Sequence, residues 1–520
     1  MNKVFRTVLI VLFVFVSWEC FSQPSIQWQK NYGGSEPDEA YDIIQADDGG
    51  YLVVGRSSSS DGDIFGYRGG WDIWAIKLDQ DGNIQWKKNL GGTENDLTNS
   101  VIQLTDGGYL ISGYTASNNI DVTNNHGGEF DGWVVKLSSN GLVLWQKTYG
   151  GSDYDQIWRS ILCDDSGFLM VGKSNSTDGD LKDNNGLFDA WIIKTDSIGN
   201  IQWQRTLGGS LDDKANAAVK TLDGGFLIIC ESNSNDGDKS SSFGGLDFWV
   251  IKLSESGDLI WEKSFGGSGQ DIPWNIVETP NSDIVISGFT TSSNTGDVGL
   301  NHGLFDYWVI KINSNGNLIW QKVLGGSNNE RAYSIAISTN EDYVISGIAG
   351  SDDGDVVGND GGAEFWVVKL SKVGDLVWQQ TYGGLLAESC YSICSTNDNG
   401  LILTGYTWSD DSGDLNGSNN FGKNDYWVLK LLPESTNTVI PLYFPLAMSP
   451  NPATTSISLQ GLETENEISI TLSNLLGQSI LQKQMSPDEP INVSNLPKGL
   501  YLVSAIGENN KAYLGKFEKL

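Results

Sequence analysis

Acidic side chains recur at three fixed positions along most of this sequence, and their carboxylates are the groups with the clearest potential for chemistry. One position lies four residues after a Gly-Gly pair, the second ends a Gly-Asp or similar turn, and the third precedes a tryptophan by two residues. The first set is Asp38, Asp96, Asp155, Asp213, Asp271, Glu330 and Glu388; the second is Asp63, Asp121, Asp180, Asp238, Asp297, Asp355 and Asp414; the third is Asp72, Asp131, Asp189, Asp247, Asp306, Glu364 and Asp425.

Carboxylate oxygens grouped in this way are the hard ligands that Ca²⁺ prefers. Three Asp-Gly-Asp turns are each followed by a further acid nine residues after their last Asp, and calcium is the one cofactor that the sequence suggests. The candidate ligands are Asp61, Asp63 and Asp72; Asp178, Asp180 and Asp189; and Asp236, Asp238 and Asp247. The EF-hand spacing, with a glutamate at position 12, is absent.

The alternative interpretation is structural. Asp caps turns by accepting backbone N–H bonds, and the third acid would tie one repeat to the next. One residue type at one place in every repeat is what the architecture itself demands, so we favour this interpretation. Seven repeated lysines, from Lys77 to Lys430, are expected to pair with these acids or to lie along outer strands.

Aromatic residues that break the repeat are better candidates for ligand binding, because a functional site must differ from its sibling copies. Tyr41, Trp158, Trp274, Tyr333 and Tyr391 share one position near the start of a predicted strand. If that strand is the innermost of its sheet, these side chains lie near the mouth of a central channel. The expected partner is an extracellular glycan or a protein.

Catalysis has little support in the sequence. There is no Gly-x-Ser-x-Gly elbow, no phosphate-binding loop and no His-x-x-x-His pair. The two histidines, His126 and His302, occupy equivalent Asn-His-Gly segments and are expected to be turn residues. We therefore predict a binding or scaffold module, with an enzyme acting on extracellular polysaccharide as the alternative.

A repeat of 58 to 59 residues positions all these side chains. The tryptophans Trp28, Trp86, Trp145, Trp203, Trp261, Trp320 and Trp378 mark it, and a second set follows the third acid by two residues. In the first repeat we expect four strands, called a to d, at residues 40–46, 51–56, 72–78 and 84–90. Asp-Gly and Gly-Gly turns between β-branched and aromatic runs are hairpin signals.

Seven copies of a four-stranded unit are typical of a seven-bladed β-propeller. The chain enters on a d-type strand, residues 26–32, and leaves the last repeat on a c-type strand, residues 425–431. The N-terminal strand is therefore expected to complete the last blade and leave no open sheet edge. The alternative is an incomplete seventh blade with a free first strand.

The repeat also resembles the SBBP-type β-propeller repeats of bacterial exported proteins over residues 26–431. The matching segments are Tyr-Gly-Gly-Ser or Leu-Gly-Gly-Ser, the Asp-Gly-Gly-Tyr-Leu turn and the Asp-x-Trp-Val-Val-Lys-Leu strand. This resemblance implies a fold and an extracellular location but no activity.

The formal net charge of −33, with a pI near 4.2, excludes whole classes of partner. Because such an acidic surface repels phosphate backbones and anionic lipid headgroups, we expect no binding to nucleic acids or membrane surfaces. Residues 1–22 have the basic and apolar regions of a cleaved signal peptide. No other stretch is long and apolar enough to span a membrane, and Cys163, Cys230, Cys390 and Cys394 are expected to be free thiols.

The pattern changes after residue 432. We expect a propeller over residues 23–432, a linker over 433–442 and a small β-sandwich over 443–520, with strands at 456–459, 468–472 and 500–503. The whole chain is thus predicted to be all-β.

The last segment resembles the type IX secretion C-terminal sorting domain. Its entry motif contains Pro450, Asn451 and Pro452, its central hairpin contains Gly477, and a Leu-x-x-Gly-x-Tyr segment contains Gly499 and Tyr501. Glu518 departs from the usual lysine-containing end. The resemblance implies passage through the type IX secretion machinery to the outer cell surface or the medium.

Overall fold

The computed structural model describes residues 23–181, 184–415, 420–434, 444–460, 462, 468–474, 479–507 and 512–520. The predicted signal peptide, most of the predicted linker and Gly477 lie outside the described residues. The described chain separates into two compact units, one within residues 21–435 and one within 436–520.

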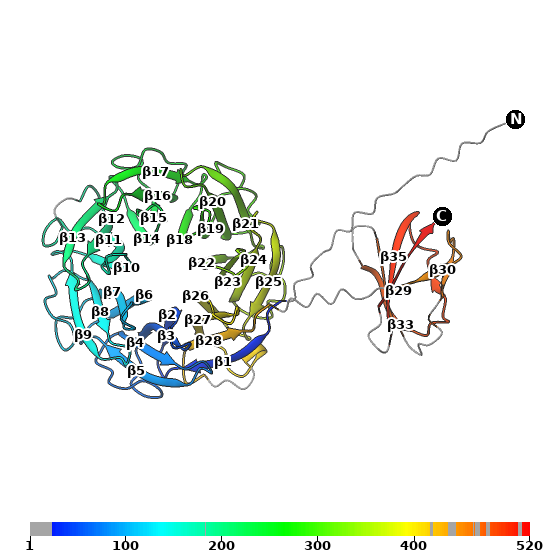
Figure 1. Ribbon diagram of the computed structural model, residues 1–520, viewed down its shortest axis with the longest axis horizontal. Coiled ribbons are helices and arrows are strands. Elements are labelled where there is room, and N and C mark those ends of the chain that lie inside the picture. The colour runs from blue at the N-terminus through cyan, green and yellow to red at the C-terminus, as the bar shows by residue number, and fades with distance from the viewer. Residues whose placement is uncertain are drawn as a thin grey trace. The chain divides into compact units, whose positions relative to one another are not determined.

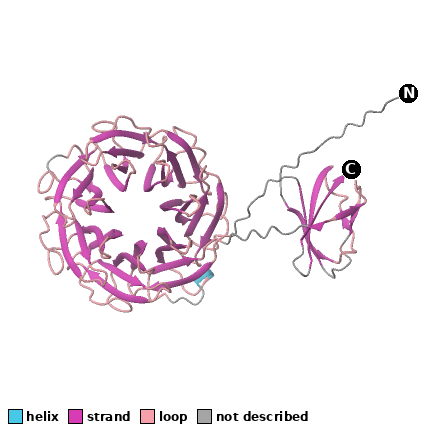
Figure 2. Cartoon of the chain, viewed as in Figure 1, coloured by secondary structure: helices cyan, strands magenta, loops and turns pink. Residues whose placement is uncertain are grey.

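The first unit consists of four-stranded antiparallel sheets, seven of them in the described residues, and each is consistent with a propeller blade (Figure 2). The a strands are β2 (Asp38–Gln45), β6 (Asp96–Gln103), β10 (Asp155–Leu162), β14 (Asp213–Lys220), β18 (Asp271–Glu278), β22 (Glu330–Ile337) and β26 (Glu388–Ser395). The b strands are β3 (Tyr51–Ser57), β7 (Tyr109–Thr115), β11 (Phe168–Ser174), β15 (Phe226–Ser232), β19 (Ile284–Thr290), β23 (Tyr343–Ala349) and β27 (Leu401–Thr407).

The c strands each begin with the third repeated acid. They are β4 (Asp72–Leu78), β8 (Asp131–Leu137), β12 (Asp189–Thr195), β16 (Asp247–Leu253), β20 (Asp306–Ile312), β24 (Glu364–Leu370) and β28 (Asp425–Leu431). The d strands are β1 (Ile26–Tyr32), β5 (Ile84–Leu90), β9 (Val143–Tyr149), β13 (Ile201–Leu207), β17 (Leu259–Phe265), β21 (Leu318–Leu324) and β25 (Leu376–Tyr382). A single turn of 3₁₀ helix, η1, spans Gly413–Leu415.

The sheets of this unit lie around a central opening, with the a strands innermost and the d strands outermost (Figure 1). The expected pairing of the first strand with the last is present: β1 pairs antiparallel with β28, from Ile26 opposite Leu431 to Tyr32 opposite Tyr426. The sheet order is therefore β1-β28-β27-β26. The two ends of this unit are held in one sheet, although about 400 residues separate them in the sequence.

Every a strand contains a bulge at its fourth residue. In the first sheet the register passes from Ala40 opposite Gly55 to Asp42 opposite Val54, so Tyr41 has no partner. The other six sheets repeat this shift. A bulge re-aims the side chain of its extra residue. Because strand a is innermost, the seven bulge residues lie on the strands nearest to the central opening (Figure 1).

The core lies between neighbouring sheets. The tryptophan of each strand c is buried, as for Trp74 and Trp308 at 1% and 0% exposed. Trp74 packs on Tyr426 of the preceding sheet at 4.6 Å between ring centroids, and Trp308 packs on Phe248 at 4.4 Å. Such aromatic pairs contribute beyond their buried area. These tryptophans pack between repeats, as the sequence predicts.

The repeated lysines of strand c differ from expectation. Lys77 is buried and pairs with Asp48 at 2.8 Å, in the turn between strands a and b. Lys136 and Lys194 pair in the same way with Asp106 and Asp165. Their partners thus form a fourth repeated set of acids. The three sets read from the sequence lie at the other end of the sheets: the first and third begin strands a and c, and the second lies in the b–c connection.

The second unit has two sheets around one apolar core. Its strands are β29 (Phe444–Pro445), β30 (Ala447–Ser449), β31 (Ser456–Gln460), β32 (Ile468–Asn474), β33 (Ser479–Met485), β34 (Ile491–Asn492), β35 (Gly499–Gly507) and β36 (Ala512–Lys519). The sheet orders are β29-β36-β35-β32-β33 and β30-β31-β34. The core contains Ile457 from one sheet and Val503 and Phe517 from the other.

Two expectations about the chain as a whole can be compared with the structure. Cys163, Cys230, Cys390 and Cys394 are all free thiols, as predicted. No helix in the described part of the chain has the length and apolarity that crossing a membrane requires.

Candidate functional site

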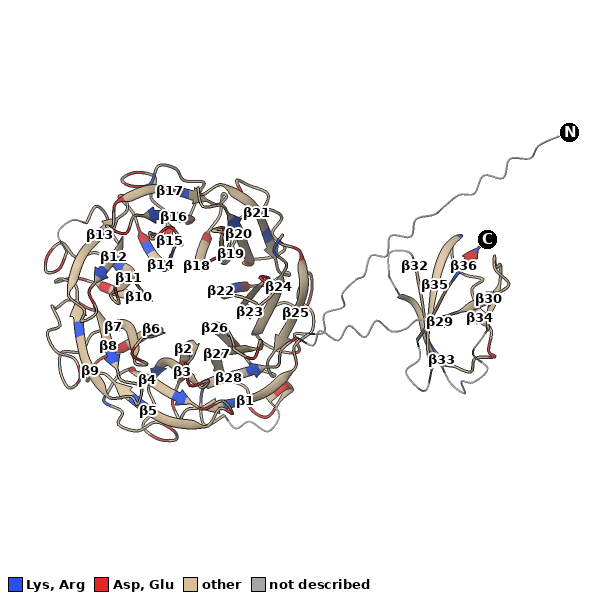
Figure 3. Ribbon diagram, in the orientation of Figure 1, with Lys and Arg blue, Asp and Glu red and all other residues tan. Residues whose placement is uncertain are grey.

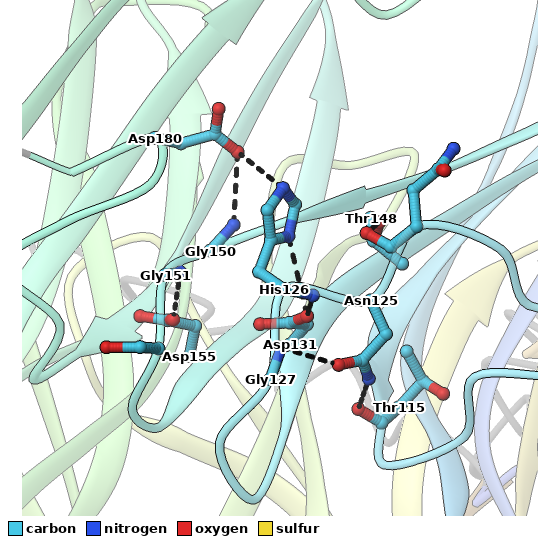
Figure 4. Close-up of polar contacts among 12 residues, drawn as sticks. Thr115, Asn125, His126, Gly127, Asp131, Thr148, Gly150, Gly151, Asp155 and Asp180 are labelled. Atoms are coloured by element: carbon cyan, nitrogen blue, oxygen red, sulfur yellow. Dashed lines mark hydrogen bonds and ion pairs between the residues drawn. The ribbon is translucent and has the colours of Figure 1, made fainter.

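Three repeated acids meet at each junction between neighbouring sheets, and they come from two different repeats. Figure 4 shows the junction between the sheets of β8 and β10. Asp155 accepts a hydrogen bond from the Gly151 N–H at 2.7 Å, and Asp180 accepts one from the Gly150 N–H at 3.1 Å. Asp131, the third acid of the preceding repeat, faces the same Gly-Gly pair. The three junction acids therefore surround the Gly-Gly pair in the connection between strands d and a.

This arrangement separates the predicted calcium ligands. Asp61 accepts from the Ser35 N–H at 2.7 Å, and the Asp63 N–H donates to the Gly33 carbonyl at 2.8 Å. Asp72 instead lies at the next junction, against Gly91.

The other two predicted groups divide in the same way. Asp178 and Asp180 bind the Gly150–Ser152 segment, whereas Asp189 faces Gly208. Asp236 and Asp238 bind Ser210 and Gly208, whereas Asp247 faces Gly266. Among the described residues, no three His, Cys, Asp or Glu side chains are placed to hold one metal ion. Calcium binding stays a prediction, and the three groups as read from the sequence are not brought together.

The first glycine of each Gly-Gly pair is required by the acids on both sides of it. Gly91 has φ +156°, and a Cβ there would lie 2.5 Å from Asp72 Oδ1 and 2.6 Å from Asp96 Oδ2. Asp96 is fixed by the Gly92 N–H and by Ser117. A side chain at this position would force two buried carboxyls apart.

Burial changes the acidity of these groups. Asp72 and Asp425 are fully buried, and loss of hydration raises the pKa of each to about 7, with neighbouring acids adding to the rise. For the same reason the pKa of Asp38, Asp96 and Asp189 is raised to about 6. The Oδ1 atoms of Asp72 and Asp425 have no hydrogen-bond partner, so nothing offsets the cost of ionising them at that oxygen.

Basic side chains also reach acids at several of the described junctions, and no repeated position in the sequence predicts this pairing. Arg68 pairs with Asp121, and Lys239 pairs with Asp247 at 3.0 Å with both side chains fully buried. His302 Nδ1 lies 2.9 Å from Asp306. His126 Nδ1 lies 3.4 Å from Asp131, and its Nε2 lies 4.0 Å from Asp180. The two histidines are thus partners of buried acids, beyond the expected turn role.

A pocket of about 220 Å³, here called the channel-mouth pocket, is lined by residues of the a and b strands, which lie toward the central opening (Figure 1). Four of the five aromatic residues predicted for ligand binding line it: Tyr41, Trp158, Trp274 and Tyr391. The fifth, Tyr333, is 7% exposed and packs between two of them. All five occupy the bulge position of strand a, which explains why one sequence position places them together.

The aromatic side chains form a continuous arc. Ring centroids are 4.9 Å apart for Tyr41 and Tyr391, 5.0 Å for Tyr391 and Tyr333, and 4.9 Å for Tyr333 and Trp274. Trp158 and Trp274 lie 6.2 Å apart. They meet because the intervening sheet has the small Asn216 at its bulge. Asn99 holds the remaining bulge position and also lines the pocket.

Two arginines line the pocket and carry no signal in the sequence pattern. Arg56 donates two hydrogen bonds to Glu39, at 3.0 and 2.6 Å, and its guanidinium lies 4.3 Å from the Trp71 ring centre. Arg159 lies 3.8 Å from Asp42 of another sheet. Burial raises the pKa of Asp42, and the charge of Arg159 opposes this rise.

Polar side chains below the arc connect the a strands. Asp42 accepts hydrogen bonds from the Val101 N–H at 2.9 Å and from the Ser392 hydroxyl at 2.8 Å. It therefore bridges the strands β2, β6 and β26. Asp42 does not itself line the pocket, but it lies 3.8 Å from Arg159, which does.

The sorting-motif residues of the second unit also come together. Asn451 donates to the Lys516 carbonyl at 2.9 Å and accepts from the Glu518 N–H at 3.0 Å, so Pro450, Asn451 and Pro452 lie along β36. Tyr501 stacks on Phe517 at 5.6 Å and donates to the Pro497 carbonyl. Gly499 begins β35. The motif segments, distant in sequence, thus form one structure with the C-terminal strand.

Solved structures that resemble the chain match it weakly. Sqt1 of Chaetomium thermophilum is 10% identical with a TM-score of 0.40, over 78% of this chain and 100% of that one. An apocarotenoid oxygenase of Synechocystis is 11% identical with a TM-score of 0.37, over 80% and 95% of the two chains. The extracellular domain of the hybrid two-component system BT3049 of B. thetaiotaomicron is 9% identical with a TM-score of 0.29, over 92% and 72%. No curated protein matches the chain in sequence.

The C-terminal unit has a recognised counterpart. The family model of the secretion system C-terminal sorting domain matches residues 447–517, which confirms the resemblance seen in the motifs around Asn451 and Tyr501. Such a domain is handled by the type IX secretion machinery. The protein is therefore secreted or attached to the outer cell surface, and its C-terminal unit is similar to the secretion system C-terminal sorting domain.

Proposed function

We propose that this protein is an exported binding module, a closed seven-bladed propeller of the SBBP-like kind that binds an extracellular glycan at the mouth of its central channel. The observation that carries the proposal is the aromatic arc. Five aromatic side chains line one pocket, and four of them stand at the bulge position of strand a, where the residue differs between repeats. Rigid aromatic side chains with amides and guanidiniums beside them are typical of ligand pockets.

Binding is favoured over catalysis by the composition of the pocket. None of its lining residues is a carboxylate, and hydrolysis of a glycosidic bond normally requires two of them. The acids nearest to the lining, Glu39 and Asp42, contact Arg56 and Arg159 respectively. An enzyme acting on polysaccharide would need a carboxyl facing the ligand.

A glycan array probed with the full chain tests the proposal. We expect binding that is lost in the double variant Trp158→Ala, Trp274→Ala. The matched control is Trp408→Ala, which removes a tryptophan that is 43% exposed and does not line the pocket. Unchanged glycan binding by the double variant would contradict the assignment of the binding site to this pocket.

Delivery by the sorting domain has a separate test. Deletion of residues 447–517 from the producing cell's copy of the protein is expected to abolish its appearance on the surface and in the medium. A deletion variant that still reaches either location would contradict handling through this domain.

A further inference from the structure

Arg159 lies at the pocket with few polar partners for its guanidinium. It is 18% exposed and lines the channel-mouth pocket, and its nearest acid, Asp42, is 3.8 Å away. That separation is too long for a hydrogen bond. No described residue accepts a hydrogen bond from this guanidinium, whereas Arg56 donates two to Glu39. Arg159 therefore has free donors in a fork that matches a carboxylate.

Asn216 supplies an unpartnered acceptor in the same pocket. Its side chain is 3% exposed, and its Nδ2 donates to the Pro273 carbonyl at 2.6 Å. Its Oδ1 is buried and has no hydrogen-bond partner. Buried polar atoms are nearly always paired in folded proteins. Asn216 lines the pocket, so this unpaired oxygen is the candidate acceptor for a ligand hydroxyl.

The walls and volume of the pocket limit the size of the group that enters. Trp158 and Trp274 lie on one side, 6.2 Å apart, and Tyr41 and Tyr391 lie 4.9 Å apart. The volume of about 220 Å³ is below the roughly 300–1,000 Å³ of pockets that enclose whole drug-sized ligands. One six-membered ring fits such a space, and its C–H face can lie on the flat aromatic side chains.

We propose that the pocket binds a sugar ring that carries a carboxylate, a uronic acid residue of an extracellular glycan, with the carboxylate on Arg159. A ring hydroxyl donates to Asn216 Oδ1, and the apolar face of the ring lies on Trp158 or Trp274. This inference rests on the proposed function, which it deepens by naming the class of sugar. An acidic peptide would satisfy Arg159 but offers no rigid array of hydroxyls to Asn216.

The distribution of charge is compatible with an anionic ligand despite the net charge of −33. Three of the five arginines that follow residue 22 lie on a or b strands: Arg56 on β3, Arg159 on β10 and Arg331 on β22. Figure 3 shows that basic residues lie on inner as well as outer strands of the first unit. Lys173, on β11, is a further basic residue on a b strand, and its Nζ lies 4.5 Å from the ring centre of Phe188. Local positive charge offsets long-range repulsion at short distance, because salt screens fields beyond about 8 Å.

Calorimetric titration of the full chain with a panel of uronic acid oligosaccharides, each paired with its methyl ester, tests this inference. At least one acid is expected to bind at least tenfold more tightly than its ester, which keeps the ring and removes the charge. Arg159→Gln is expected to abolish this difference, and Arg205→Gln, on the outer strand β13, is expected to leave it unchanged. Matching Tm values of the variants show that they are folded.

The outcomes separate the inference from the proposed function. Esters that bind as tightly as acids, with both lost in Trp158→Ala, would overturn the role of Arg159 and leave glycan binding intact. Sulfated sugars or acidic peptides that bind more tightly than every uronic acid would overturn the carboxylated sugar. Absence of binding to every saccharide would remove both the inference and the proposed glycan ligand.

Discussion

The junctions between sheets and the mouth of the channel use the same repeat in opposite ways. At the junctions, the first acid accepts the N–H of the second glycine in its Gly-Gly pair in every copy, as Asp38 does for Gly34 and Glu388 for Gly384. At the channel mouth, one bulge position holds tyrosine, tryptophan or asparagine. Residues that are uniform between copies connect neighbouring sheets, and residues that differ between copies line the channel-mouth pocket.

The comparison also divides the tryptophans. Trp86 of strand d packs on Tyr109 of the next sheet at 6.2 Å and recurs in every repeat. Trp158 occupies the bulge position, and only one of the other six copies, with Trp274, has a tryptophan there. The tryptophans therefore have two different roles, packing between sheets or lining the pocket, and the position within the repeat distinguishes them.

The largest expected effect is on stability, from a substitution at a junction glycine. Gly91→Ala places a Cβ 2.5 Å from Asp72 Oδ1 and 2.6 Å from Asp96 Oδ2, and we expect it to lower the free energy of unfolding by about 3 kcal/mol. Gly107→Ala is the control, because its φ of +77° is also positive but no atom lies within 4 Å of an added Cβ; about 1 kcal/mol is expected there. Denaturant titration measures both, and equal losses would contradict the role of the flanking carboxyls.

Exchanging the two kinds of tryptophan for alanine gives the next largest effect. Trp158→Ala is expected to weaken glycan binding about 30-fold, or about 2 kcal/mol, with little change in Tm. Trp86→Ala is expected to lower Tm and leave affinity unchanged, since Trp86 packs between sheets. Calorimetry measures the glycan affinity of both variants, and thermal unfolding measures their Tm. A loss of affinity in Trp86→Ala equal to that in Trp158→Ala would remove the distinction.

The junction acids predict a dependence of stability on pH. Burial raises the pKa of Asp72 to about 7 in the folded protein, so the folded state binds this proton more tightly than the unfolded chain. The resulting stabilisation is fully present below the ordinary Asp pKa of 3.8 and is lost as pH rises through about 7. Asp72→Asn should reduce the fall in Tm between pH 5 and pH 8 by about 2 °C. Asp81→Asn, in an exposed turn, serves as the control and should retain the full fall.

Calcium is expected to have the smallest effect. Asp61 and Asp155 already accept backbone N–H bonds, so the capping interpretation predicts that Ca²⁺ or a chelator shifts the Tm by less than about 1 °C. A rise of several degrees with millimolar Ca²⁺ that Asp61→Asn removes would establish a calcium site and contradict the capping interpretation at that loop.

The sequence predicted the repeat, the c and d strands of the first repeat with their exact ends, and the pairing of residues 26–32 with 425–431, because these follow from periodicity and chain order. Strand a begins at Asp38, two residues before the expected start, because the Asp38 N–H bonds the Asn424 carbonyl of the neighbouring sheet. Such contacts between repeats have no local signature. For the same reason Asp72 was grouped with Asp63, although it faces Gly91 and Asp96 of the next junction.

The candidate site could be predicted only in part. The aromatic residues at the bulge stood out because they depart from a repeated position. Arg159 and Asn216 did not, since a single arginine or asparagine forms no pattern and its importance depends on which polar atoms remain unpaired after folding. The pocket thus combines a signal that repetition reveals with one that only three-dimensional packing supplies.

The most direct test of the account is a crystal structure of the full chain with a bound uronic acid oligosaccharide. The account predicts one sugar ring in the channel-mouth pocket, with its face on Trp158 or Trp274 and its carboxylate on Arg159. A glycan bound instead along the repeated tryptophans of the outer strands, such as Trp86, would contradict the claim that residues departing from the repeat carry the function.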